Sequence, residues 1–272
     1  MRADLRLDAL RHAPPGQVIG RELRAVPRAG STNELAAAAA HAGAPEGLVI
    51  LADEQTAGRG RQGRGWVAPP GSSLLLSVLL RPALAAAEAF ALTMLAAVAL
   101  CEAVEQAAQT PAALKWPNDL MLLAHTPDGP ALRKAAGILT ELEVRDGMVA
   151  WAVVGIGVNV NWMPAGEVDG RDLAATATSV AAAAGRPVDR GALLWALLAA
   201  LDGRYAALRR EGPGQLFTAW RARLATLGQE VTVRLPVGEV RGRAEDVEPN
   251  GALIVREPSG ARRRVLAGEV GS

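Results

Sequence analysis

The sequence predicts a mixed α/β domain followed by a small β-barrel. Apolar runs of strand length, among them GLVILA and SLLLSVLL, alternate with segments of helical length, the longest over residues 86–108. Such a mixture favours a sheet covered by helices. From Gly228 onward only short strand-like runs remain, separated by Pro, Gly and Asn turns, which is typical of a small barrel. We therefore predict an N-terminal segment at 1–30, a main domain at 31–226 and a C-terminal domain at 227–272.

The first elements of the main domain can be predicted in order. Residues 1–30 are rich in Arg and Pro without a periodic pattern, and they are too short for a DNA-binding domain. A helix is expected from Ser31, because Ser31 and Glu34 have the spacing of a capping box and Gly43 suits the helix end. A buried strand follows in GLVILADE, then a glycine-rich stretch, then a second strand in SLLLSVLLR.

The later elements alternate strands and helices. After the helix at 86–108, ALKW and DLMLL read as short strands, and KAAGILTELEV and MVAWAVVGIGVNVN as an antiparallel pair turning at 145–147. Helices are expected at 176–184, 189–211 and 214–226. The C-terminal strands span about 45 residues, too few to fold comfortably alone, so this part should pack on the main domain.

Composition narrows the classes of function. Arg and Lys number 29 and acidic residues 28, for a formal net charge of +1, so we expect no nucleic-acid partner. No window is long and charge-free enough for a membrane span and no signal peptide is recognised, so we expect a cytoplasmic protein without a membrane partner. The single cysteine, Cys101, excludes an internal disulfide and is expected in the core of a helix.

The stretch from Gln55 to Trp66 (QTAGRGRQGRGW) concentrates four glycines and three arginines. A solvated surface loop and an Arg-Gly nucleic-acid tether are two explanations. A third is a folded loop that binds an anion, since glycines let backbone N–H groups approach it and arginines add forked donors. The stretch is a single copy between two strands, which favours the anion-binding loop. It matches neither the Walker A loop nor the dinucleotide fingerprint.

Two further segments have both an ordinary and a functional explanation. Asn118 and Asp119 in KWPNDL form an ordinary turn after a proline. Beside a phosphate site, however, Asp119 could hold magnesium and Asn118 could bond a nucleotide. GIGVNVN ends a strand whose glycines can mark close approach by a ligand, and Asn159 there can donate and accept at once, which suits a purine edge.

Lysine is rare in this chain. Lys115 and Lys134 are the two lysines among 29 basic residues, so these positions stand out as places where a compact ammonium is kept. We expect Lys134 at the edge of a strand after a polar loop. A lone lysine in such a place is ordinarily a solvated surface charge.

The order of the five segments STN, GRGRQGRGW, KWPND, KAAGIL.E and GIGVNVN resembles the biotin protein ligase family, and the resemblance runs from about Ser31 to the C-terminal GEV. It implies a class II synthetase-like catalytic domain at 31–226, of the fold shared with lipoate ligases, and an SH3-like barrel at 227–272. Because the first segment is short, the chain is similar to the ligase-only form that has no DNA-binding domain.

The resemblance also implies a reaction. Family members join biotin to ATP as biotinyl-5′-AMP and pass the biotinyl group to a lysine of a carrier protein. The implied cofactors are ATP and Mg²⁺, and the implied partner is the biotin carboxyl carrier domain of acetyl-CoA carboxylase or a related carboxylase. Either a monomer or a homodimer is compatible with this scaffold. A lipoate or octanoate ligase and an Arg-rich nucleic-acid-binding module are the alternatives.

The residues implied by the resemblance fall into two groups. Those implied for biotin lie in three motifs: Ser31, Thr32, Asn33, Gln55, Arg59, Gly60, Arg61 and Lys134. Ser31 and Thr32 would reach the ureido ring. Those implied for ATP and the adenylate are Gly58, Arg61, Trp66, Asn118, Asp119, Lys134 and Asn159. Lys134 and Arg61 would be catalytic, Trp66 would stack on adenine, and Asp119 would be the magnesium ligand.

Overall fold

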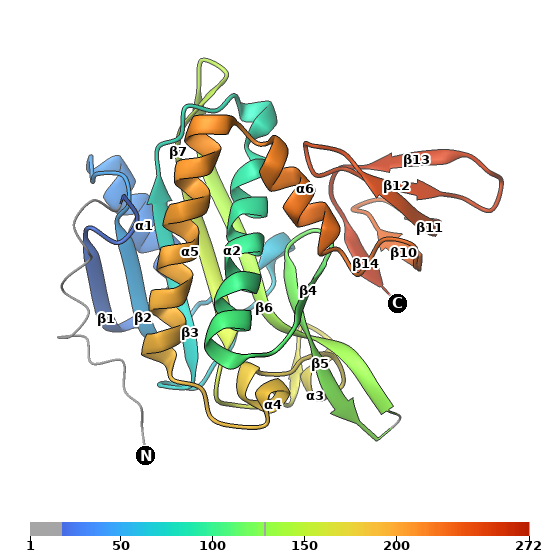
Figure 1. Cartoon of the computed structure of the whole chain (residues 1–272), viewed down its shortest axis with the longest axis horizontal. Helices are drawn as coiled ribbons and strands as arrows, with labels where there is room; N and C mark the ends of the chain where they lie inside the picture. Colours follow the sequence, from blue (N-terminus) through green and yellow to red (C-terminus); the bar gives the residue numbers. More distant parts are fainter. Residues whose placement is uncertain (1–17, 128, 272) are drawn as a thin grey trace.

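The computed structural model describes residues 18–127 and 129–271 and contains a seven-stranded mixed sheet (Figure 1). The strand order is β1-β2-β3-β7-β6-β5-β4, and β1 pairs parallel with β2 while all other neighbours are antiparallel. The strands are β1 (Leu23–Ala29), β2 (Val49–Gln55), β3 (Ser73–Leu80), β4 (Ala112–Lys115), β5 (Asp119–Thr126), β6 (Gly129–Arg145) and β7 (Met148–Asn159).

Helices cover both faces of this sheet. The long helices α2 (Phe90–Ala108) and α5 (Arg190–Glu211) pack against each other on one face, with α6 (Gly214–Ala222) beside them, whereas α1 (Thr32–His41) packs on the other face (Figure 1). Successive residues of β2 therefore serve two cores: Val49 joins the cluster under α2 and Ile50 the cluster under α1. Burial on both faces explains why these strands are continuous apolar runs.

One strand of the main sheet and the division of one helix were not predicted. Residues 23–29 form β1, an additional parallel strand at the edge next to β2, whereas the sequence showed no periodic pattern there; residues 1–17 lie outside the described part. The prediction of one continuous helix at 176–184 is also wrong, because this region contains two short helices, α3 (Leu173–Thr176) and α4 (Val180–Ala184). A short hairpin of β8 (Glu167–Val168) and β9 (Arg171–Asp172) precedes them.

The C-terminal part is a five-stranded antiparallel sheet in the order β13-β12-β11-β10-β14. Its strands are β10 (Glu230–Arg234), β11 (Glu239–Val247), β12 (Leu253–Arg256), β13 (Arg262–Val265) and β14 (Glu269–Gly271). The predicted class, a mixed α/β fold with an all-β C-terminal part, is confirmed. This sheet contacts the main domain directly, since the indole Nε1 of Trp116 donates to the carbonyl of Gly251 at 2.8 Å.

The expectation that no window resembles a membrane span is wrong for two helical segments. Residues 86–108 and 190–211 are long and apolar enough to cross a membrane by length and composition. In the folded chain, 78% of the apolar window of the first and 44% of that of the second is buried inside the protein. Packing against the sheet and against each other accounts for their apolar composition, as for core helices of a folded domain.

Cys101 lies in α2 and is completely buried, as predicted. Burial raises the pKa of its thiol to about 12, because the thiolate would lose its solvation. The thiol is therefore protonated and unreactive at neutral pH, which fits a packing role.

We predict that Gly251→Ala destabilises the protein by about 3 kcal/mol, because an alanine there combines left-handed backbone strain with overpacking. Gly251 has φ +85°, and a Cβ would lie 2.2 Å from Cδ1 of Phe90. Urea unfolding would measure the loss.

Gly260→Ala is the matched control, since its φ is +86° and a Cβ would meet no atom within 4 Å. It should cost only the backbone strain, about 1 kcal/mol. Equal losses in the two variants would show that the contact with Phe90 does not hold the C-terminal sheet on the main domain.

Candidate active site

A cavity of about 420 Å³ lies on the α1 face of the sheet. Its walls come from the start of α1, the glycine-rich loop after β2, the turn between β4 and β5 with the start of β5, the middle of β6, the end of β7, residues within 164–177, and β14 of the C-terminal sheet. Gly58 is the one predicted site residue that does not line it. The predicted residues that do are Ser31, Thr32, Asn33, Gln55, Arg59, Gly60, Arg61, Trp66, Asn118, Asp119, Lys134 and Asn159.

Three glycines form the floor of the cavity. In the antiparallel pair of β6 and β7, Gly137 lies opposite Gly157. Gly155 is two residues before Gly157 in β7 and therefore faces the same side of the sheet. A Cβ on Gly155 would lie 2.1 Å from Oδ1 of Asn33, and a Cβ on Gly157 would lie 2.7 Å from the indole ring of Trp66. Only glycine lets these side chains lie directly on the strand backbone.

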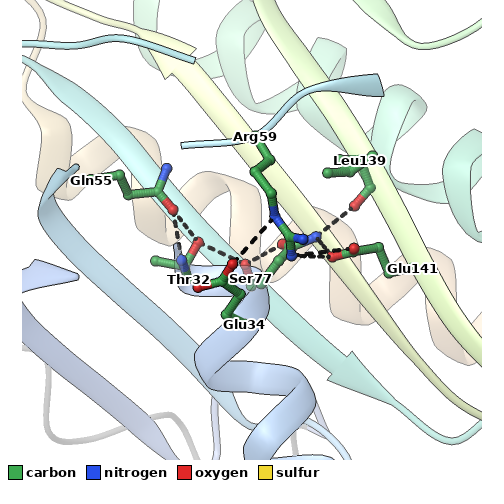
Figure 2. A network of polar contacts seen from close by, with 8 residues as sticks. Thr32, Glu34, Gln55, Arg59, Ser77, Leu139 and Glu141 are labelled. Atoms are coloured by element: carbon green, nitrogen blue, oxygen red, sulfur yellow. Dashed lines mark hydrogen bonds and ion pairs between the residues drawn. The ribbon is translucent and has the colours of Figure 1, made fainter. Parts of the chain in front are cut away.

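A chain of polar contacts forms one end of the cavity (Figure 2). Gln55 Oε1 accepts hydrogen bonds from the amide and the hydroxyl of Thr32 at 2.6 and 3.0 Å. The Ser77 hydroxyl lies 2.8 Å from Thr32 Oγ1 and 2.6 Å from Asn33 Oδ1. Ser77, on β3, is fully buried and does not line the cavity, but it bonds two residues that do. Sequence reasoning missed it because it lies in the middle of a mostly apolar strand.

The capping box predicted at Ser31 is not formed. Ser31 occupies the N-cap position of α1 with extended backbone angles, but its side chain makes no capping hydrogen bond. Instead, Gln55 from β2 accepts the first helical amide, that of Thr32. Ser31 is 3% exposed and lines the cavity, so its residue type serves the site rather than the helix end.

The glycine-rich stretch is a folded loop over the cavity. It is closed by hydrogen bonds from the amide of Gly60 to the carbonyl of Arg64 at 2.7 Å and from the amide of Trp66 to the carbonyl of Gly58 at 2.8 Å. Two acidic residues from later in the chain hold its far end: Asp169 accepts from the amide of Gly65 at 2.9 Å, and Glu269 of β14 pairs with Arg64.

Arg59 holds the near end of the loop. Its guanidinium lies 3.7 Å from Glu34 of α1 and 3.3 Å from Glu141 of β6 (Figure 2). Glu141 also accepts a hydrogen bond from Asn33 Nδ2 at 2.7 Å. Sequence reasoning assigned no role to Glu141, although it is the final residue of the KAAGIL.E segment.

Arg61 is a partly buried cation of the loop. Burial lowers the pKa of its guanidinium, opposed by the nearby Asp119 carboxylate, and Arg64 adds a smaller lowering. Its Nη1 lies 3.4 Å from Asn118 Oδ1. A guanidinium remains protonated through such a shift, so Arg61 carries a poorly solvated positive charge that an anion would stabilise.

Lys134 was expected at the edge of a strand, and this expectation is wrong. It lies inside β6, a strand with neighbours on both sides. Its ammonium lies 2.7 Å from Asp119 Oδ1 and 5.7 Å from the centroid of the Trp66 ring. The register of β5 and β6 shifts here: Leu120 pairs with Ala136, but Met121 pairs with Lys134. The extra residue, Ala135, is a bulge that directs Lys134 to the same face as Gly137.

The two asparagines are tied to the backbone at the other end of the cavity. Asn118 Nδ2 donates to the carbonyl of Ile138 at 2.5 Å, and Asn159 Nδ2 donates to the carbonyl of Thr178 at 3.1 Å. Asn159 is 4% exposed. Trp66, the last residue of the loop, has a buried indole Nε1 without a hydrogen-bond partner among the described residues.

The described residues contain no group of three His, Cys, Asp or Glu side chains that could enclose a metal ion. Of the acidic residues that line the cavity, Asp169 and Glu269 bond the glycine-rich loop, whereas Asp119 lies beside Lys134. A magnesium site at Asp119 would therefore have one carboxylate. Such a site could hold Mg²⁺ only together with water and oxygen atoms of a bound phosphate, which is how magnesium is commonly held with nucleotides.

Comparisons with known proteins agree with this architecture. The family model described as "Biotin/lipoate A/B protein ligase family" matches residues 26–159, and "Biotin protein ligase C terminal domain" matches residues 226–270. The biotin–[acetyl-CoA-carboxylase] ligase of Mycobacterium tuberculosis is 36% identical over 256 residues, covering 92% of this chain and 88% of that protein. The bifunctional ligase/repressor BirA of Bacillus subtilis is 33% identical over 233 residues, covering 86% and 69%.

The fold is likewise similar to solved structures. Biotin protein ligase from Aquifex aeolicus, in complex with biotin and ATP, matches with a TM-score of 0.73 at 26% identity and covers 92% of this chain and 98% of that one. The match extends over both the main sheet and the C-terminal sheet. By sequence motifs, family models and fold, the chain belongs to the biotin protein ligases of the biotin/lipoate A/B protein ligase family.

Proposed function

We propose that this chain is an ATP-dependent biotin ligase that activates biotin as biotinyl-5′-AMP and transfers the biotinyl group to a lysine of a biotin carboxyl carrier domain. The observation that carries the proposal is one cavity with an oxygen-lined end at α1 and a cationic end at Arg61 and Lys134, beneath a glycine-rich loop. The names of its relatives support biotin over lipoate or octanoate as substrate, and a ligase over a nucleic-acid-binding module.

The oxygen-lined end suits the ureido ring of biotin. A cyclic urea presents two N–H donors, and Thr32, Asn33 and Gln55 place side-chain oxygens at this end. The buried Ser77 hydroxyl connects Thr32 to Asn33. Ser31 and Gly60 complete the wall of this half of the cavity. The valerate carboxylate would then extend toward the cationic end.

The cationic end suits the joining of two anions. In the first step an oxygen of the biotin carboxylate bonds to the α-phosphorus of ATP, and the bond to the bridging oxygen breaks as pyrophosphate leaves with the electron pair. The carboxylate and the triphosphate repel each other, so positive charge fixed between them lowers the barrier. We assign this role to Lys134 and Arg61, with Arg59 on the side of biotin.

The remaining predicted residues would hold the nucleotide. We propose that Trp66 stacks on adenine, that Asn118 and Asn159 contact the nucleotide, and that Gly58 shapes the loop around it; a Cβ on Gly58 would lie 2.4 Å from the carbonyl oxygen of Trp66. Mg²⁺, held by Asp119 and the phosphates, would supply further charge neutralisation at the triphosphate.

In the second step the amine of the carrier lysine bonds to the acyl carbon, AMP leaves, and the amine loses a proton. The nucleophile belongs to the partner, which is why the chain needs no nucleophile of its own. The carrier of acetyl-CoA carboxylase or a related carboxylase is the proposed partner. We propose residues 31–226 as the catalytic domain, with residues 227–272 contributing Glu269 beside the loop.

We predict that the chain adds one biotinyl group to a carrier domain when incubated with biotin and ATP. Intact-mass spectrometry would show the added mass, and a carrier whose acceptor lysine is replaced by arginine would not gain it. Equal modification with lipoic acid in place of biotin, or no modification with either acid, would contradict the proposed function.

We predict that Lys134→Gln slows adenylate formation about a hundredfold, the effect of removing one preorganised donor of about 3 kcal/mol. The fold should remain intact, because the Lys134 side chain is 35% exposed. Pyrophosphate release at saturating biotin and ATP would measure the rate.

Arg133→Gln is the matched control, since Arg133 is the adjacent cation, does not line the cavity, and donates a side-chain hydrogen bond to the carbonyl of Ala174. It should change the rate little. Turnover near the wild-type value in Lys134→Gln would instead make Lys134 a structural partner of Asp119.

We predict that the loop at 55–66 exchanges its amide hydrogens quickly without ligand and slowly with biotinyl-AMP. Glycine loses much entropy on ordering, the three arginines repel one another, and the ion pairs that hold Arg59 are partly exposed. Hydrogen-exchange mass spectrometry would measure this, with β3 as an internal reference that stays protected. Exchange that is equally slow in both states would mean that the loop is already ordered.

A further inference from the structure

The hydrogen-bond chain at the oxygen-lined end has fewer protons than contacts. Three oxygen–oxygen contacts run in series from Gln55 Oε1 through Thr32 Oγ1 and Ser77 Oγ to Asn33 Oδ1, at 3.0, 2.8 and 2.6 Å. Both ends are carbonyl oxygens, which only accept, and the two hydroxyls supply one proton each. One of the three contacts therefore has no proton, and one acceptor site in this row of oxygens remains without a donor.

This surplus depends on which way the Asn33 amide faces. If its NH₂ group faced Ser77, Asn33 would donate into the chain and every contact would have a proton. Gln55 cannot turn in the same way, because its oxygen accepts the backbone amide of Thr32 at 2.6 Å. The donor and acceptor character of this end of the cavity is thus decided at Asn33.

Glu141 decides the orientation of Asn33. Asn33 Nδ2 lies 2.7 Å from Glu141 Oε2 and 3.3 Å from the carbonyl oxygen of Leu139. Both partners only accept, so the NH₂ group must face them and the amide oxygen must face Ser77. Leu139 makes the longer bond of the two, so the carboxylate is the main constraint.

We propose that Glu141 is a positioning residue for substrate recognition. By holding the Asn33 amide oxygen toward Ser77, it leaves one of the three oxygen–oxygen contacts without a proton. This row of oxygens therefore favours a ligand that brings N–H donors, such as a cyclic urea. This inference rests on the proposed function, because it takes biotin as the ligand of this end. Glu141 is not a lining residue of the cavity and acts through Asn33.

Glu141 also contacts Arg59, and the two roles must be separated. The Arg59–Glu141 pair has side chains that are 42% and 35% exposed, and its closest approach is 3.3 Å. A pair of this kind contributes little on its own. Glu141→Gln removes the charge for Arg59 but keeps an oxygen at the position of Oε2, whereas Glu141→Ala removes both.

The test is the dissociation constant of biotin, measured by calorimetry on the full chain. Glu141→Ala should weaken biotin binding about tenfold or more, since a mispaired polar group costs about that much, and the dissociation constant of ATP should not change. Glu141→Gln should recover most of the affinity. Glu143→Gln is the matched control, because Glu143 is two residues along the same strand and bonds Arg145 and Trp151 instead.

Double-mutant cycles test the route through Asn33. In an Asn33→Ala background, and in a Ser77→Ala background that leaves α1 unchanged, the further change Glu141→Ala should have little effect on biotin affinity. A full tenfold loss in these backgrounds, or wild-type affinity in Glu141→Ala alone, would overturn the inference while leaving the proposed function intact. A wild-type chain that does not bind biotin at all would overturn the proposed function instead.

Discussion

The close approach of side chains to bare strand backbone is the constraint on which the site depends. Gly137, Gly155 and Gly157 leave the centre of the α1 face without side chains, so Asn33 and Trp66 lie directly on β6 and β7. Everything else in the cavity is arranged around this floor. A single methyl group at Gly155 or Gly157 would collide with a residue of the site, so the cavity cannot be altered there without moving its walls.

The charges around the cavity come from distant parts of the chain. The glycine-rich loop contributes the arginines, while α1, β6, the segment near Asp169 and β14 contribute the acidic partners. These contacts are mostly partly exposed and individually weak. Because these contacts are weak and spread along the loop, the loop can be ordered and still open. This suits a segment that must admit two substrates and then exclude water from a reactive mixed anhydride.

Much of the fold and site could be predicted from the sequence because it is encoded locally. Helical and strand-length periodicities located α2, α5 and the antiparallel pair β6–β7, and glycine spacing marked both the loop and the cavity floor. The prediction was poorer where partners far along the chain decide the outcome. Residues 23–29 become a strand only because β2 offers an unpaired edge, and Ser31 makes no capping bond because Gln55 accepts the first helical amide.

The sequence by itself determined the mixed α/β class, the change to short strands after Gly228, and the segments that carry the chemistry, since these depend on residue type and spacing. The tertiary structure alone decided how those segments combine. Lys134 and Gly137 are three residues apart and would face opposite sides of a regular strand, yet the bulge at Ala135 places both in the cavity. Ser77 and Glu141 reach the lining residues Thr32 and Asn33 for a similar reason. A side chain's direction and partners are fixed by strand register across the sheet, and no local pattern in the sequence records that register.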